Sequence, residues 1–191
     1  MAGTPLKIAI IVGSPSKQSR LNGLTAKVEQ KLRDEEAQVD WVIVNELPPE
    51  DLIYAKFDSP HIQKANAIIE QADAVVVASP VYKAAYTGVL KTYLDLLPQK
   101  GLEGKIVLPL FIGGTISHLL SIDYALKPVL SALGAKHILS GVFAVDSWVS
   151  KTDQGHYELS EELQTRLEGA AAELVQEARL RKEFRGVTSV Q

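Results

Sequence analysis

Short apolar runs alternate along this chain with amphipathic segments of helical period, a pattern typical of repeated strand–helix units. The run Ala74–Ala78 is apolar and largely β-branched, as expected for a strand that is buried on both faces. Strand character recurs in four further stretches: Ile8–Val12, Val39–Val44, Ile106–Ile112 and His137–Val145. Five such strands with helices between them predict an α/β fold built on a doubly wound parallel sheet.

The segments between the strands predict helices at about 21–35, 60–71, 88–97, 118–133 and 161–183. Ser59 suits the N-cap of one helix, with Pro60 at its first helical position, and Ser160 suits the N-cap of the last helix. Two prolines conflict with the pattern. Pro109 removes a hydrogen-bond donor from its strand, and Pro128 predicts a kink or an interruption in its helix.

The strand order 2-1-3-4-5 is the expected arrangement, which makes the fold a flavodoxin-like three-layer sandwich. Right-handed crossovers then bring the loops after strands one, three and four to the same edge of the sheet. Ligands of open α/β sheets bind at this carboxyl edge. We therefore expect residues 1–191 to form a single domain whose binding site is built from these three loops.

The amino-acid composition excludes several classes of protein and of chemistry. The chain has 191 residues, of which 46% are hydrophobic, and a formal net charge of −3. This balance does not call for nucleic acid or an anionic membrane as a partner. Because there is no cysteine, disulfides, thiol catalysis and thiolate metal sites are excluded. The chain shows no signal peptide and no apolar run of membrane-spanning length, which predicts a cytoplasmic location.

The first loop, Gly13–Gly23, combines small hydroxyl residues, a helix N-terminus and two cations, Lys17 and Arg20. These features favour a site for an anion such as a phosphate monoester. The alternative is a polar strand-to-helix turn, which is ordinary in α/β domains. Neither G-x-G-x-x-G nor G-K-[ST] is present, which disfavours a dinucleotide Rossmann enzyme and an NTPase.

The second loop, Ser79–Lys91, follows the buried central strand. Pro80 fixes the backbone direction, Val81 and Tyr82 offer apolar and aromatic surface, and the backbone near Lys83 offers amides. A planar cofactor such as a flavin needs this mixed environment. The alternative is that the tyrosines of this segment only cap the core.

In the third loop, the adjacent Gly113 and Gly114 allow a backbone to approach a ligand closely, or they serve a turn that needs positive φ. We expect His118 to lie near the pocket without a catalytic role. The histidines show no metal-ligand spacing, and no Ser-His-acid order can be argued. The sequence therefore predicts no metal site and no catalytic side chain.

Taken together, these segments resemble the NAD(P)H-dependent FMN reductases, in particular the reductase component of two-component alkanesulfonate monooxygenase systems. The likeness extends from about Lys7 to Asp146. The stretches that carry it are Gly13–Pro15, Ser19–Arg20, Asp51–Pro60, Ser79–Lys91, Leu94–Pro98, Gly113–Thr115 and Asp123–Leu130.

The resemblance implies a flavodoxin-like fold and roles for particular residues. The residues implied to hold the FMN phosphate are Ser14, Ser19, Arg20 and Asn22. Those implied to line the isoalloxazine are Pro80, Val81, Tyr82 and Lys83, with Gly113, Gly114 and Thr115 closing its far side. Many family members carry an arginine where this chain has Ser16, so we expect Lys17 to supply the charge instead.

Tyr124 is a further binding residue by resemblance, since an inserted tyrosine at this place forms a π-bulge at a subunit interface near the flavin. Such bulges often mark functional sites. The helix offers an apolar face for that interface, formed by Leu119, Leu120, Ile122 and Leu126. The alternative is a buried tyrosine in an ordinary core helix.

The resemblance implies an enzyme that passes a hydride from NADPH or NADH to FMN. It also implies a homodimer or tetramer that releases reduced FMN to a partner monooxygenase in sulfonate or sulfur assimilation. Because the hydride chemistry belongs to the cofactors, the protein supplies binding and orientation. Two alternatives share the fold: a quinone or azo reductase that keeps its FMN bound, and a flavodoxin-type electron carrier.

Overall fold

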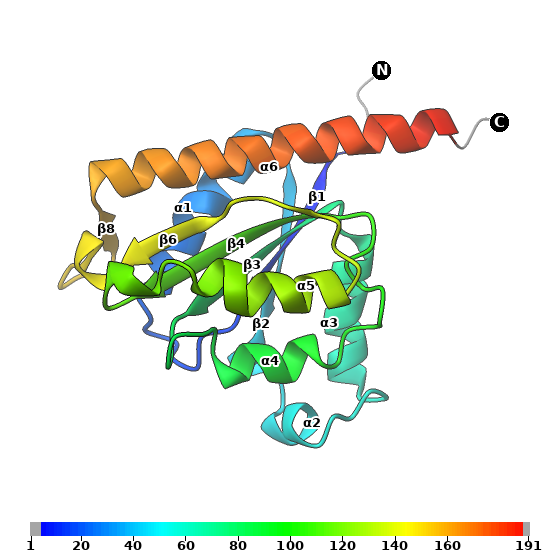
Figure 1. The fold of residues 1–191 in the computed structure, drawn as a ribbon, viewed down its shortest axis with the longest axis horizontal. Coiled ribbons are helices and arrows are strands. Elements are labelled where there is room, and N and C mark those ends of the chain that lie inside the picture. Colours follow the sequence, from blue (N-terminus) through cyan, green and yellow to red (C-terminus); the bar gives the residue numbers. More distant parts are fainter. Residues whose placement is uncertain (1–4, 189–191) are drawn as a thin grey trace.

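The computed structural model describes residues 5–188, which form a parallel sheet covered by helices on both faces (Figure 1). The strand order β2-β1-β3-β4-β5 confirms the predicted order and fold class, with β6 pairing to β4 beyond β5. The six strands are β1 (Lys7–Val12), β2 (Gln38–Ile43), β3 (Ala74–Pro80), β4 (Ile106–Gly113), β5 (His137–Ile138) and β6 (Val142–Val145).

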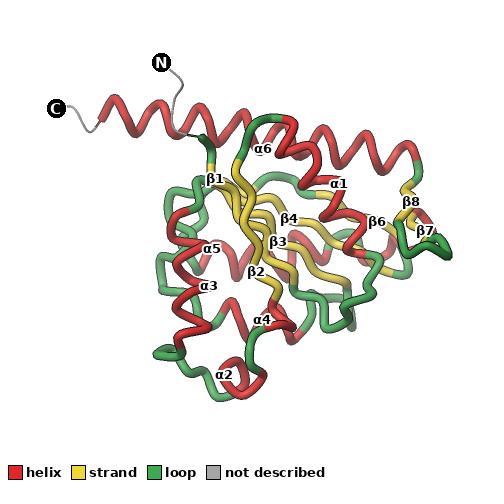
Figure 2. The backbone as a smooth tube through the Cα atoms, turned by 180° about the vertical axis from the view of Figure 1, so that it is seen from behind, coloured by secondary structure: helices red, strands yellow, loops and turns green. Residues whose placement is uncertain are grey.

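The helices form the two outer layers (Figures 1 and 2). One face carries α1 (Leu21–Asp34) and the long α6 (Glu161–Thr188). The other carries α3 (Pro60–Gln71), α4 (Gly88–Leu94) and α5 (Lys127–Ala132), with the short α2 (Pro49–Ile53) at its end. Alternate side chains of β1, β3 and β4 enter the two cores, which explains why these strands are almost entirely apolar.

Two helices begin where their capping residues predicted. The Ser59 hydroxyl accepts a hydrogen bond from the His61 N–H at 3.3 Å at the start of α3. The Ser160 hydroxyl accepts one from the Leu163 N–H at 3.4 Å at the start of α6. Each bond satisfies a donor that the first helical turn leaves without a partner.

The predicted last strand, His137–Val145, is wrong as a continuous element, because β5 and β6 are separate. The break lies beside Pro109, which has no N–H to donate to a neighbouring strand. Gly141 turns the chain there with a φ of +83°, and a Cβ on it would lie 2.8 Å from the Pro109 carbonyl oxygen. The proline in β4 therefore divides the edge of the sheet.

The predicted helix 118–133 is also not continuous. It consists of a 3-10 turn, η2 (Ile116–His118), a π-helix, η3 (Ile122–Leu126), and α5. The π-helix confirms the bulge expected around Tyr124. Pro128 sits in the first turn of α5, so the predicted interruption takes the form of the change from π-helix to α-helix directly before the proline. The wider π-turn removes the need for the i→i−4 bond that a proline cannot make.

Several short elements were not predicted. Beyond α2, they are the 3-10 turns η1 (Val44–Glu46) and η4 (Asp146–Trp148) and a hairpin of β7 (Val149–Lys151) and β8 (Tyr157–Leu159). Strands of three residues are too short to show a hydrophobic alternation. The hairpin packs on α1, where a Cβ on Gly23 would lie 2.8 Å from the Cβ of Tyr157.

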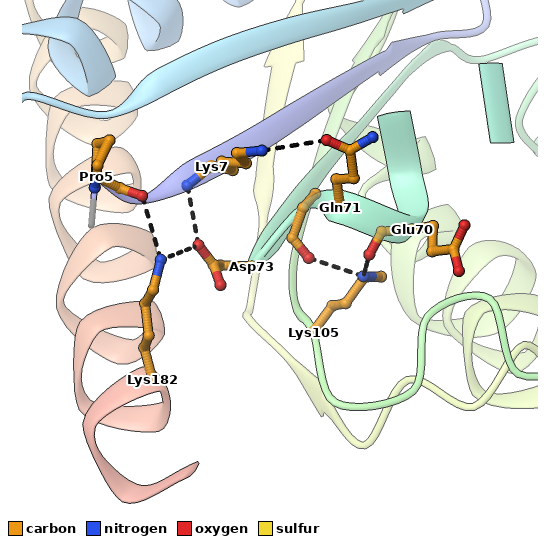
Figure 3. Close-up of polar contacts among 8 residues, drawn as sticks. Pro5, Lys7, Glu70, Gln71, Asp73, Lys105 and Lys182 are labelled. Atoms are coloured by element: carbon orange, nitrogen blue, oxygen red, sulfur yellow. Dashed lines mark hydrogen bonds and ion pairs between the residues drawn. The ribbon is translucent and has the colours of Figure 1, made fainter. Parts of the chain in front are cut away.

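A basic residue near the end of α6 connects this helix to the sheet. Lys182 Nζ lies 2.9 Å from an Asp73 carboxylate oxygen that also accepts the Lys7 backbone N–H at 3.0 Å (Figure 3). Beside them, the buried Lys105 donates to the carbonyls of Glu70 at 2.9 Å and Ala72 at 2.7 Å. These contacts tie α6, β1, β4 and the end of α3 together at the amino edge of the sheet.

Within residues 5–188, no helix combines the length and the apolar character that a membrane crossing requires.

Tyr93 in α4 gives a direct test of the core. Its side chain is fully buried, its hydroxyl has no hydrogen-bond partner among the described residues, and burial raises the pKa of that hydroxyl well above its ordinary value. Because an unpaired buried hydroxyl is destabilising, Tyr93→Phe is expected to raise the free energy of unfolding by about 1 kcal/mol. Urea denaturation measures this change. A loss of stability in Tyr93→Phe would contradict the prediction.

Candidate functional site

A pocket of about 360 Å³ opens at the carboxyl edge of the sheet, where the three predicted loops meet. It brings together seven predicted site residues: Ser19, Arg20, Pro80, Val81, Tyr82, Gly113 and Gly114. Five residues that were not predicted also line it: Ser16, Gln18, Ile112, Asp146 and Lys151. The other predicted residues lie outside this pocket: Ser14, Asn22, Lys83, Thr115 and Tyr124.

Ser14 and Asn22 shape the first loop from outside the pocket. The buried Ser14 hydroxyl donates to the Ser16 carbonyl at 3.0 Å and accepts the Ser16 N–H at 3.2 Å. The Asn22 side chain donates to the Lys17 carbonyl at 2.9 Å. These bonds hold the backbone that carries Ser16, Ser19 and Arg20 into the pocket.

The first loop presents donors at the start of α1. The backbone N–H groups of Lys17, Ser19 and Arg20 make no hydrogen bond to any described residue. The first turn of α1 contains no acidic residue, so its positive end is not neutralised locally. A helix N-terminus with free amides is a site that suits a phosphate group.

Arg20 and Lys151 supply the positive charge of the pocket. The Arg20 Nε–H donates to the Val149 carbonyl at 3.0 Å, which holds β7 beside the first loop and places Lys151 in the pocket wall. Lys17, by contrast, forms an ion pair with Glu46 at 3.6 Å and lines a different pocket. Its position does not support the expected replacement of the family arginine by Lys17.

The second loop contains a tight turn at Tyr82–Ala85. The backbone of Tyr82 donates to the Ala85 carbonyl at 2.8 Å, and Ala85 donates back at 3.2 Å. Lys83 and Ala84 occupy the turn with φ of +51° and +63°, a conformation that costs non-glycine residues energy. This turn presents the Tyr82 ring to the pocket and leaves Lys83 exposed outside it.

A threonine that the sequence analysis missed joins the first two loops. Thr87 caps α4 by accepting the Leu90 N–H at 3.0 Å, and its hydroxyl donates to the Gly13 carbonyl. Its own N–H is held by the Ser79 hydroxyl at 3.0 Å. The signal was visible, because a threonine directly before a helical segment is a preferred N-cap.

Two glycines form the far wall of the pocket. A Cβ on Gly113 would lie 3.2 Å from Phe143 Cζ and 3.3 Å from Val81 Cβ, so a side chain there would crowd the wall. A Cβ on Gly114 would extend toward the Asp146 carboxylate, 3.9 Å away. Asp146 follows the carboxyl end of β6, a position typical of ligand contacts. Lys151 has no comparable signal in the sequence.

Beyond this wall the chain continues through Thr115, His118 and Tyr124. The Thr115 hydroxyl accepts the Ser117 N–H at 3.3 Å and thereby caps η2. Tyr124 is 80% exposed on η3, so the alternative of a buried core tyrosine is wrong. Ile122 and Leu126 are buried in the core of their own chain and cannot form the predicted interface face. Leu119 and Leu120 remain exposed.

Metal chemistry has no candidate in the described part of the chain, where no group of three or more His, Asp or Glu side chains is placed to hold an ion. The pocket offers instead a first loop with free backbone amides, the aromatic Tyr82 and two glycines.

The family model for NADPH-dependent FMN reductases matches residues 6–150, which include the three loops and exclude Lys151. The chain belongs to the NADPH-dependent FMN reductase family. This FMN reductase is 50% identical over 167 residues to an FMN reductase (NADPH) of Escherichia coli (strain K12), with 86% of each chain covered. It is 32% identical over 155 residues to the NADH-dependent FMN reductase SfnF of Pseudomonas putida, which covers 79% of this chain and 82% of that one.

A solved structure of an NADH:FMN oxidoreductase in its apo form matches with a TM-score of 0.79 and 32% identity over 88% of each chain. These similarities confirm the expected enzyme class: the protein is an NAD(P)H:FMN oxidoreductase whose cofactors are FMN and a nicotinamide dinucleotide.

The residues present fit FMN. The free amides of the first loop and the cations Arg20 and Lys151 suit its phosphate, and Val81 and Tyr82 offer a surface for its ring. Gly114 leaves room in the wall that a side chain would fill, since only the Asp146 carboxylate lies within 4 Å of its Cβ position.

The strained turn in the second loop gives a testable expectation. Ala84→Gly is expected to stabilise the protein by about 1 kcal/mol, because glycine adopts a positive φ without the steric cost that alanine has. The neighbouring Ala85→Gly is the matched control, since the φ of Ala85 is not positive. Thermal unfolding of both variants compares them, and equal changes would contradict the assignment of strain to Ala84.

Proposed function

We propose that this FMN reductase takes up free FMN as an exchangeable substrate and releases reduced FMN to a flavin-dependent monooxygenase. Support comes from the form of the pocket, which is built from surface loops. Arg20 is exposed at its edge, and Tyr82 is 54% exposed in its wall. The proposed recipient acts on a sulfonate, following the resemblance of the loop segments to the reductases of alkanesulfonate systems.

Each part of the pocket has a role in this proposal. When bound, FMN supplies a ring that accepts a hydride from the nicotinamide. The first-loop amides, Arg20 and Lys151 bind its phosphate. Pro80, Val81 and Tyr82 orient the ring, and the absence of a side chain on Gly114 leaves space beside them. Because this chemistry needs orientation and no proton transfer by a side chain, we assign no catalytic residue.

Steady-state kinetics test the proposal. NADPH and NADH oxidation is measured with and without added FMN, with the apo protein at submicromolar concentration. We expect activity to require free FMN and to saturate with it. A purified protein that is yellow and turns over only with a quinone or azo acceptor would contradict the proposal in favour of a reductase with bound FMN. A protein that binds FMN but oxidises no nicotinamide would favour the electron carrier.

We also propose that the protein is a homo-oligomer with η3 in its interface. Exposed apolar side chains gather on η2 and the segment that leads into η3: Ile116, Leu119, Leu120 and Tyr124, with exposed fractions from 45% to 80%. Contiguous apolar surface of this kind is typical of interaction sites.

Deletion of Tyr124 tests the interface, with oligomer mass measured by sedimentation and flavin retention measured by titration. We expect a smaller species and weaker flavin retention. Tyr54→Ala is the control, because Tyr54 is exposed to a similar degree near α2, apart from this patch. An unchanged mass and unchanged flavin retention after the deletion would contradict the proposal.

A further inference from the structure

The pocket of about 360 Å³ proposed above to bind FMN is called the flavin pocket from here on. A second pocket, of about 440 Å³, lies next to it, between α1 and the carboxyl end of β2. Its walls come from α1, the end of β2 and the first loop, and Ser16 lines both pockets. The two pockets are therefore neighbours along the carboxyl edge of the sheet. None of the roles assigned above to the flavin-binding residues accounts for this second pocket.

An aromatic platform forms one wall of the second pocket. Trp41 is half-buried against the core, and its indole Nε1–H donates to the Glu29 carboxylate at 3.0 Å. That carboxylate is itself held by Arg33, whose Nη2 lies 2.7 Å from the same oxygen. Val12 and Ile43 add apolar surface beside the indole. A fixed, partly exposed indole next to apolar side chains is a surface on which a planar base can stack.

An unpaired acceptor also lies in this pocket wall. The Asn45 side chain donates through Nδ2 to the Ser14 carbonyl at 2.8 Å, which fixes the orientation of its amide. Its buried Oδ1 has no hydrogen-bond donor among the described residues. Buried polar atoms without a partner are uncommon in folded proteins. Because Asn45 lines the pocket, a small shift of its amide would let a ligand N–H, such as the amino group of an adenine, supply the missing partner.

The charges of this pocket select a neutral group over a phosphate. Glu29 and Glu46 both line it, while Lys17 is its one cation among the described lining residues and already lies 3.6 Å from Glu46. Carboxylates disfavour an anion inside the pocket. The second pocket therefore suits a neutral base, while the amides of the first loop remain with the FMN phosphate.

We propose that the second pocket binds the adenine of the nicotinamide dinucleotide. This proposal rests on the proposed function. The sheet order puts β2 three strand spacings from β4, a distance of about 14 Å across the carboxyl edge. Dinucleotides of open α/β sheets lie across several strand ends in this way. The nicotinamide is then at the flavin pocket beside β3 and β4, while the adenine stacks on Trp41 next to β2.

Filling the pocket tests this assignment. Ala26 is an exposed residue of α1 that lines the second pocket and not the flavin pocket. Because leucine is a strong helix former, Ala26→Leu preserves α1 and occupies the pocket. We expect the KM for NADPH to rise about tenfold, with kcat and the Kd for FMN unchanged. This is the pattern for loss of a contact that stabilises the bound substrate and the transition state equally. Gln30→Leu, one turn further along α1 and outside this pocket, is the control that leaves all three values unchanged.

A binding measurement on the apo protein decides the same point without turnover. The probe is 5′-AMP, and the signal is tryptophan fluorescence. We expect 5′-AMP to quench the emission of the wild type and of Trp148→Phe, and to leave that of Trp41→Phe unchanged. Saturating FMN should not displace the nucleotide.

An unchanged KM in Ala26→Leu, quenching that survives in Trp41→Phe, or displacement of 5′-AMP by FMN would each overturn the adenine site. These outcomes are separate from failure of the proposed function, which is judged by FMN-dependent NADPH oxidation in the wild type.

Discussion

Replacing Gly13 by alanine is expected to lower the free energy of unfolding by about 3 kcal/mol, the largest change predicted for a single methyl group in this protein. A Cβ on Gly13 would lie 2.4 Å from the Cβ of Leu90 and 3.0 Å from its Cα. Leu90 is fully buried in α4, so its side chain cannot move aside. The helix itself would have to shift. Because Thr87 at the start of α4 donates to the Gly13 carbonyl, this shift would also disturb both flavin loops.

Urea denaturation and FMN titration measure the two effects of Gly13→Ala. Gly169→Ala is the matched control, because Gly169 lies within α6 with no heavy atom within 4 Å of its Cβ position. That variant should gain about 1 kcal/mol from the higher helix propensity of alanine. A Gly13→Ala protein as stable as the wild type would show that α4 does not pack on the first loop as described.

The second large effect is expected at Arg20, where alanine should weaken FMN binding by about 10- to 100-fold. The range corresponds to one charge-assisted hydrogen bond to the phosphate. Arg20 lines the flavin pocket, and its Nε is bound to the Val149 carbonyl at 3.0 Å. That contact leaves the two terminal amino groups of the guanidinium free to bind an anion. Fluorescence titration with FMN gives the Kd.

Riboflavin separates the two roles of Arg20, since it carries the same ring without the phosphate. If Arg20 acts on the phosphate, Arg20→Ala leaves the affinity for riboflavin unchanged. An equal loss for riboflavin and FMN would mean that the arginine acts through β7 by holding Val149. Arg33→Ala is the control for removing a charge from α1, because the exposed Arg33 pairs with Glu29 far along the helix and does not line the flavin pocket.

Much of the fold could be predicted because the signals are local. The strands are buried on both faces, so apolar runs such as Ile8–Val12 and Ala74–Ala78 mark them directly. Ser59 and Ser160 mark helix starts because a capping side chain bonds to backbone only a few residues away. The strand order 2-1-3-4-5 is the one common to flavodoxin-like sheets, and the structure confirms it.

Loops that directly follow strands meet in one pocket as expected, and the binding roles of their residues stay a prediction. Arg20, Tyr82 and Gly113 line the flavin pocket because the carboxyl ends of β1, β3 and β4 meet at one edge. The structure does not support the prediction that Lys17 replaces the arginine that many family members carry at the position of Ser16. The direction of a side chain depends on partners that are distant in the sequence. Glu46, at the end of η1, pairs with Lys17. No local pattern connects these two residues.

The sequence by itself determined the layered α/β architecture and the loops that line the candidate pocket. It also indicated the π-helix at Tyr124, because the family resemblance around this residue lies in one continuous segment. Only the tertiary structure decided which side chains of those loops face the pocket. It also brought Lys151 to Arg20 through the unpredicted hairpin, joined Thr87 to Gly13, and placed Trp41 beside Asn45. The physical reason is range: hydrophobic periodicity and capping act over a few residues, whereas these contacts are set by packing between segments far apart in the chain.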